Sequence, residues 1–242
     1  MTPARVGLGR TGVSQQVRDL LDFQLAHAQA RDAVHARMEA AALAAEIAAV
    51  SGSEVIRLHS AASDRATYLQ RPDLGRKLDE ASSAALSALV KTAAVSADLV
   101  LIVADGLSAL ATERHVLPLL IEMLPRLHGW RLAPVCVVEQ GRVAVGDEIG
   151  AMLGALLSVV LIGERPGLSS PDSLGAYITW QPRPGRTDAE RNCISNIRTD
   201  GLRYSEAAAQ LAQCLTEARR LEVTGVSLKL SNHKLNRQLE GE

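Results

Sequence analysis

An unusual polar block, Gly163-Glu164-Arg165-Pro166-Gly167-Leu168, directly follows the apolar run Leu156–Ile162. The run is short, rich in β-branched residues and bounded by a turn signal, so it predicts a buried strand. Ligands bind at the carboxyl ends of strands in open α/β sheets. We therefore interpret Glu164 as a carboxylate that faces a polar ligand, with the glycines on either side letting the backbone come close. The alternative is an ion pair between Glu164 and Arg165, which would contribute little to stability.

A second block mixes polar and apolar residues in the order Arg191-Asn192-Cys193-Ile194-Ser195-Asn196-Ile197. A nucleophilic Cys193 would need a nearby base, and none of the six histidines forms a motif with it. Its isoleucine neighbours predict a partly buried thiol with a raised pKa, which favours a structural or ligand-packing cysteine. The histidines also lack metal-binding spacing such as H-E-x-x-H, so we expect neither a catalytic residue nor a metal ligand. Cys136 and Cys214 are expected in the core.

A third candidate is Asp105, in the segment Asp105-Gly106-Leu107-Ser108 that follows the predicted strand Leu99–Val103. Its carboxylate could accept a hydrogen bond from a ligand. Alternatively, Asp105 or Ser108 caps the helix that comes next.

The segment Gly7-Leu8-Gly9-Arg10-Thr11-Gly12 matches the dinucleotide-binding pattern G-x-G-x-x-G. That pattern needs a strand before it, and too few residues precede Gly7 to form one. It also needs an acidic residue after a second strand, whereas Asp32 lies inside a predicted helix. We interpret the segment as an arm that docks on another surface, and a nucleotide-binding Rossmann module is the alternative.

The composition excludes several classes of protein. The 26 Lys and Arg balance 27 Asp and Glu, and aromatic residues make up only 2% of the chain, which argues against nucleic-acid binding. No apolar stretch reaches the roughly 18 residues of a membrane span, and the N-terminus does not resemble a signal peptide. The three cysteines are widely spaced and form no C-x-x-C pair, which favours a reducing, cytoplasmic setting.

Hydrophobic periodicity divides the chain into a helical first part and a second part in which strands and helices alternate. In the first part we expect a helix from Ser14, as its N-cap, to Val50, a strand at Glu54–His59 and a helix from Pro72 to Ala94. In the second part we expect strands at Leu99–Val103, Ala133–Val138, Leu156–Ile162, Ala176–Trp180 and Cys193–Ile197, with a short one near Gly141–Val145. Helices are expected at Ser108–Leu127, Asp147–Leu156 and Ser205–Leu221. The alternation indicates an α/β fold with a mostly parallel sheet flanked by helices, and a helical N-terminal extension.

Five blocks together resemble the small (light) subunit of ethanolamine ammonia-lyase, over about residues 3–229. These blocks are Arg5–Gly12, Tyr68–Arg76, Ala104–Ser108, Gly163–Leu168 and Cys193–Ile197. The resemblance implies an adenosylcobalamin-dependent lyase that converts ethanolamine to acetaldehyde and ammonia by a radical mechanism. It also implies a partner, the large subunit, whose TIM barrel holds the substrate, with cobalamin lying between the two subunits.

On the positions of this chain, the resemblance implies that Val143, Glu164 and Cys193 contact the cobalamin. The motif D-x-H-x-x-G is absent, so the cofactor would keep its own base on the cobalt. The implied domains are an N-terminal arm and helical region (1–95), a Rossmann-like cobalamin-binding domain (96–228) and a polar C-terminal tail (229–242). The implied assembly is a hetero-oligomer of paired and trimerised heterodimers, in the cytoplasm or within a bacterial microcompartment. A non-enzymatic assembly protein, suggested by the long alanine-rich helices, is a second alternative.

Overall fold

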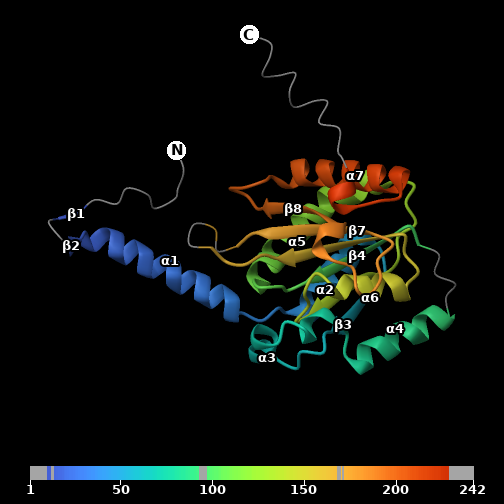
Figure 1. The fold of residues 1–242 in the computed structure, drawn as a ribbon, viewed down its shortest axis with the longest axis horizontal. Coiled ribbons are helices and arrows are strands. Elements are labelled where there is room, and N and C mark those ends of the chain that lie inside the picture. Colours follow the sequence, from blue (N-terminus) through green and yellow to red (C-terminus); the bar gives the residue numbers. More distant parts are fainter. Residues whose placement is uncertain (1–9, 12–13, 93–96, 168–169, 171, 229–242) are drawn as a thin grey trace, which may run out of the picture.

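The structure is a computed structural model that describes residues 10–11, 14–92, 97–167, 170 and 172–228. Its centre is a six-stranded sheet with the strand order β3-β5-β4-β6-β7-β8 (Figure 1). The strands are β3 (Val55–His59), β4 (Leu99–Ala104), β5 (Val135–Glu139), β6 (Leu157–Gly163), β7 (Leu174–Trp180) and β8 (Arg191–Ile197). Near the N-terminus, β1 (Arg10–Thr11) and β2 (Ser14–Gln15) form a separate two-stranded sheet.

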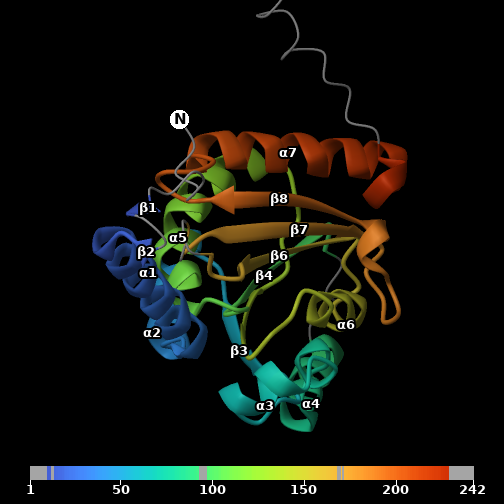
Figure 2. The ribbon, with the colours of Figure 1, turned by 60° about the vertical axis from the view of Figure 1, so that its left-hand side comes forward.

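Helices cover both faces of the central sheet (Figure 2). One face packs against α2 (Ala40–Ser51), α5 (Ala109–Met123) and α7 (Tyr204–Leu221), and the other against α4 (Glu80–Thr92) and α6 (Val145–Met152). The remaining helices are α1 (Val17–His35), α3 (Arg65–Gln70) and the 3₁₀ turns η1 (Leu74–Arg76), η2 (Leu124–Leu127), η3 (Asp188–Glu190) and η4 (Gly225–Ser227). Along β4, Leu101 and Val103 face the first layer whereas Val100 and Ile102 face the second, so this strand is apolar throughout.

The α/β class with flanking helices is confirmed, but the sheet is mixed rather than mostly parallel. Strands β3, β5, β4 and β6 are parallel to one another, whereas β7 and β8 run antiparallel to their neighbours. The reason lies in the connection between β6 and β7, residues 164–173, which is shorter than the dozen or so residues of a parallel crossover. Strand β3, from the first part of the chain, completes the sheet at one edge.

The helix predicted from Ser14 to Val50 is two helices. Ser14 lies in β2 and Gln16 is the N-cap of α1, so the predicted cap is wrong. The helix is interrupted between α1 and α2, where Met38 is buried in the core. The backbone N–H of Glu39, at the start of α2, donates to the side chain of Glu113 in α5. The interruption is therefore supported by tertiary contacts rather than by a glycine or proline.

Three other expected elements differ from the observed ones. Within the described part of the helix expected from Pro72 to Ala94, the chain forms η1 and then α4, which begins only at Glu80. The sequence prediction also missed α3, which precedes this range and is capped by the Asp64 side chain. No strand forms at residues 141–145, where a turn leads into α6. Helix α6 ends at Met152 because Gly154, with φ of 62°, turns the chain towards β6. No helix within the described ranges is both long and apolar enough to cross a membrane.

Candidate functional site

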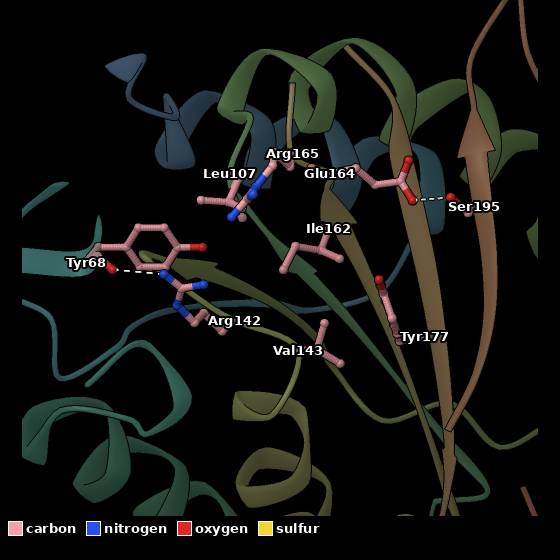
Figure 3. Close-up of a pocket in the computed structure, with 11 residues that line it drawn as sticks. Tyr68, Leu107, Arg142, Val143, Ile162, Glu164, Arg165, Tyr177 and Ser195 are labelled. Carbon is pink, nitrogen blue, oxygen red and sulfur yellow. Dashed lines mark hydrogen bonds between the residues drawn. The ribbon is translucent and has the colours of Figure 1, made fainter. Parts of the chain in front are cut away.

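The loops after the parallel strands form a pocket at the carboxyl edge of the sheet. The loop after β4 leads to α5 on one face, and the loop after β5 leads to α6 on the other, which leaves a crevice between them. A pocket of about 430 Å³ opens there (Figure 3). Besides the loops after β4, β5 and β6, Tyr68 of α3, Tyr177 of β7 and Ser195 of β8 line it.

Glu164 lines this pocket and forms no ion pair with Arg165 among the described contacts. Its Oε2 accepts hydrogen bonds from the Ser173 hydroxyl at 2.7 Å and the Asn196 backbone N–H at 3.1 Å. Its Oε1 accepts from the Ser195 hydroxyl. A carboxylate has about four acceptor positions, so these three donors leave about one for a ligand. Glu164 therefore has two roles. It connects the end of β6 to the start of β7 and to β8, and it presents a hydrogen-bond acceptor at the pocket.

Of the two glycines around Glu164, Gly163 is required by packing within the chain. A Cβ atom on Gly163 would lie 2.0 Å from the carbonyl oxygen of Ser108, so this glycine lets β6 pack against the loop after β4. Gly106, with φ of 57°, belongs to the loop after β4 and packs against Gly163 in turn. A Cβ on Gly106 would lie 2.2 Å from the Gly163 carbonyl oxygen. A Cβ on Gly167 would make only ordinary contacts.

Asp105 is buried and holds the loop after β5 in place. The backbone N–H groups of Gln140 and Gly141 each donate to its carboxylate at 3.0 Å. The Nη1 atom of Arg65 lies 3.6 Å from the Asp105 Oδ2 atom, and both side chains are buried. Asp105 therefore neither caps a helix nor lines the pocket, and the capping role belongs to Ser108, at the start of α5.

Asp105 gives a prediction for the pH dependence of stability. Burial raises its pKa from 3.8 to about 6, although Arg65 and the backbone N–H donors oppose this shift. A pKa above the unfolded-state value means that protonation favours the folded state, so this stabilisation is complete below about pH 4 and is lost as the pH rises through about 6. We expect the Asp105 carboxyl carbon to titrate with a midpoint of about 6 in a carbon-13 NMR titration, assigned with the Asp105→Asn variant. A midpoint of about 4 would instead show that Arg65 dominates.

Val143 and Arg142 follow β5 and both line the pocket. Val143 packs on the core beside α6. The Arg142 guanidinium lies over the ring of Tyr68, 4.5 Å from its centroid, and its Nη2 donates to the Tyr68 carbonyl oxygen at 3.1 Å. Figure 3 shows this arginine on the side of the pocket opposite Ser195. Neither Tyr68 nor Arg142 stood out in the sequence as a separate candidate, although Tyr68 begins one of the five blocks and Arg142 directly precedes Val143.

Cys193 lies on β8 and is paired in register with Tyr177, which lines the pocket. The residue as a whole is exposed at this edge strand, but its sulfur is partly shielded from water. Desolvation of the sulfur and the nearby Glu164 raise the pKa of its thiol, whereas a hydrogen bond with the Tyr177 side chain lowers it. A raised pKa agrees with an unreactive thiol. Cys136 and Cys214 are buried in the core, as predicted.

Some of the sequence-based candidates fall outside the described residues. In the segment Gly7–Gly12, only Arg10 and Thr11 are described, so its binding role stays untested. The C-terminal tail at 229–242 also lies outside the described part. Within the described ranges, no group of three or more His, Cys, Asp or Glu side chains could hold a metal ion.

Comparison with known proteins supports the resemblance. A family model described as "Ethanolamine ammonia-lyase light chain (EutC)" matches residues 1–229. The ethanolamine ammonia-lyase small subunit of Pseudomonas aeruginosa (strain LESB58) is 57% identical over 231 residues, which cover 95% of this chain and 84% of the relative. The small subunit of Pseudomonas fluorescens (strain SBW25) is 55% identical over 231 residues, covering 95% of this chain and 83% of the relative. This chain belongs to the ethanolamine ammonia-lyase light chain family and is a subunit of a lyase.

Proposed function

We propose that this chain forms one wall of an adenosylcobalamin site that the large subunit of ethanolamine ammonia-lyase completes. In this proposal the assembled enzyme converts ethanolamine to acetaldehyde and ammonia, and this chain is inactive alone. The observation that carries the proposal is the pocket at the carboxyl edge of the sheet. Val143 and Glu164 line it together, and Tyr177, the register partner of Cys193, forms part of its wall.

The side chains at the pocket suit a large ligand with many amide groups and an apolar body. Glu164 offers an acceptor to an amide N–H or a hydroxyl, and Val143 and Ile162 offer apolar surface. The Nε atom of Arg142 is buried and has no hydrogen-bond partner among the described residues, which is consistent with a ligand acceptor there. When bound, adenosylcobalamin would supply the radical chemistry. The residues of this chain would hold and orient it and would exclude water.

We further propose that β4, β5 and β6 with α5 and α6 act as a Rossmann-like unit. The support is that these strands are parallel, that their two helices lie on opposite faces, and that the pocket lies at their carboxyl ends. In this division residues 96–228 carry most of the cofactor wall, to which Tyr68 of the first part of the chain is added. Residues 1–95 supply the arm and helices for partner contact, in addition to β3, and residues 229–242 form a polar tail.

Helix α1 supports the partner role. It projects away from the sheet, as Figure 1 shows, and only Ala26 and Ala33 are buried. Val17, Leu21 and Leu25 follow one another at intervals of four residues, and their exposed fractions are 70%, 57% and 60%. Such a stripe on a helix is suited to contact with another protein. We assign this stripe to the large subunit.

The double variant Leu21→Lys/Leu25→Lys is expected to weaken binding to the large subunit at least about tenfold, because two apolar contacts would become charged. Both side chains are exposed in this chain, so its own folding should be unaffected. Affinity is measured by titrating the labelled chain with the large subunit. Gln210→Lys, at an exposed position of α7 rather than α1, is the control and should bind like the wild type. Equal affinities for all three proteins would contradict this assignment.

The expected assembly is a hetero-oligomer of paired and trimerised heterodimers. The expected location is the cytoplasm, including the bacterial microcompartments in which some members of the family work. Three free cysteines are consistent with a reducing compartment.

The proposal is tested by reconstitution. The purified chain is mixed with a competent large subunit, adenosylcobalamin and ethanolamine, and acetaldehyde is measured together with the corrinoid retained after gel filtration. Acetaldehyde formation that depends on both subunits is the expected result. Absence of activity would contradict the proposal. Binding of the large subunit without corrinoid would favour an assembly protein, and binding of a dinucleotide to the chain would favour a nucleotide-binding module.

A further inference from the structure

Arg142 borders three neighbouring cavities, which share lining residues and are together called the cleft. It lines the pocket described above, a second cavity of about 460 Å³ towards α1 and a third of about 440 Å³ towards the loop between β7 and β8. Val143 and Tyr177 border the first and third cavities, and Leu107 and Arg165 border the first and second. A ligand that filled this cleft would therefore meet the Arg142 side chain.

The Arg142 side chain is held in one position by its surroundings. Its guanidinium lies on the Tyr68 ring and donates to the Tyr68 carbonyl oxygen. Its backbone N–H donates to the Gly75 carbonyl oxygen at 2.8 Å. A Cβ on Gly75 would lie only 3.1 Å from the Arg142 Cγ atom, so the glycine makes room for the arginine stem. This support pre-organises the guanidinium for a ligand.

The charge of Arg142 has no carboxylate partner in the described part of the chain. None of the ion pairs formed by the described residues includes Arg142. Its Nε atom is buried and makes no hydrogen bond. Arg65, which lies over the same Tyr68 ring, differs because Asp105 lies 3.6 Å from it. A partly buried guanidinium without an anionic partner is costly, and an anion bound at the cleft would reduce that cost.

We propose that Arg142 binds the phosphodiester of the nucleotide tail of the cofactor, and this inference rests on the proposed function. The phosphodiester is the one anionic group of cobalamin at neutral pH, because its other polar side chains are amides and hydroxyls. A guanidinium matches the geometry of phosphate oxygens, and Arg–phosphate hydrogen bonds are stronger than neutral ones. Arg165, which is exposed, lines the first and second cavities together with Arg142 and adds positive charge there. Glu164 lies on the opposite side of the pocket, where it can accept hydrogen bonds from the neutral amide or hydroxyl groups of the cofactor.

The test compares three corrinoids that differ only in the tail. Adenosylcobalamin carries the complete nucleotide, adenosylcobinamide phosphate carries the phosphate without the base, and adenosylcobinamide carries neither. Their affinities for the complex with the large subunit are measured from the absorbance change on binding. We expect Arg142→Gln to weaken binding of the two phosphate-bearing corrinoids about 10- to 100-fold and that of adenosylcobinamide less than about twofold. Arg183→Gln removes an exposed arginine that does not line these three cavities and should change none of the affinities.

A conservative variant distinguishes loss of phosphate recognition from a folding defect. Arg142→Lys keeps the charge but not the planar fork, so it should lose part of the affinity for the phosphate-bearing corrinoids only. Equal losses for all three corrinoids would overturn the inference, as would a loss confined to adenosylcobalamin, which would indicate recognition of the base or ribose. If Arg142 instead binds free inorganic phosphate, Arg142→Gln would leave the affinities for all three corrinoids unchanged, and that result would also overturn the inference. A wild-type complex that binds no corrinoid would instead refute the proposed function on which the inference rests.

Discussion

Replacing Asp147 with alanine is expected to lower the free energy of unfolding by about 3–5 kcal/mol, because Arg191 would remain buried without its carboxylate partner. In the structure the two Asp147 oxygens accept hydrogen bonds from the Nη1 and Nη2 atoms of Arg191, both at 2.6 Å. Both side chains are only 2% exposed. Thr179 accepts a further hydrogen bond from Nη1. This neutral acceptor does not compensate the charge of the guanidinium, which Asp147 does.

Urea denaturation of the chain measures this effect, and a second acidic partner of Arg191 provides the control. Asp188 lies 3.4 Å from Arg191, but its side chain is 95% exposed. Asp188→Ala should therefore cost at most about 1 kcal/mol. Replacing both members of the buried pair, as in Asp147→Leu/Arg191→Met, should restore part of the stability that the single variant loses. A change of less than about 1 kcal/mol for Asp147→Ala would contradict the prediction.

The same ion pair connects the elements that carry two of the proposed cofactor contacts. Asp147 belongs to α6, which begins just after Val143, and Arg191 starts β8, which carries Cys193. Arg191 also borders the cavity that Val143 and Tyr177 line. We therefore expect Asp147→Ala to lower corrinoid affinity in the reconstituted complex as well.

Glu164→Ala is expected to weaken cofactor retention about 10- to 100-fold, which corresponds to loss of one hydrogen bond to a charged acceptor. The effect on folding should be smaller. Two of the three donors to Glu164, the Ser195 hydroxyl and the Asn196 N–H, belong to exposed residues that water can reach. The third donor, Ser173, is buried and would lose its partner, which costs about 1–3 kcal/mol at most.

Corrinoid affinity of the complex and urea stability of the chain are measured side by side for this variant. Ser173→Ala is the matched control, because it removes a donor to Glu164 without touching the lining of the pocket. It should reduce corrinoid affinity only a few-fold. An unchanged affinity for Glu164→Ala would show that this carboxylate serves only to join the three strands.

The sequence by itself predicted most of the strands and the edge of the sheet at which the pocket lies. The apolar runs around Leu99–Val103 and Leu156–Ile162 are too short for spanning helices and too apolar for surface, so burial in a sheet was the consistent interpretation. Because carboxyl ends of parallel strands meet at one edge, polar residues after successive strands fall together. Glu164 accordingly lines a pocket with residues that follow β4 and β5, and Val143, which only the resemblance implied, lines the same pocket. The sequence could not show that three donors of the chain already occupy the Glu164 carboxylate.

Strand direction and helix breaks depended on tertiary structure. Side chains alternate with the same period in parallel and antiparallel strands, so the pattern of β7 and β8 could not give their direction. The short connection at residues 164–173 was the available signal. At residues 36–39 there is no helix breaker, and the interruption depends on the burial of Met38 and the bond from Glu39 to Glu113.

The amino-acid sequence alone determined the family, the α/β class and the edge of the sheet where polar groups gather, because these follow from local patterns and motif blocks. Only the tertiary structure decided which charges are compensated. Asp105 is close to Arg65 and Asp147 pairs with Arg191, whereas Arg142 has no carboxylate beside it among the described residues. Those partners are far apart in the chain, and the free energy of a charge depends on burial and neighbours that sequence spacing does not encode.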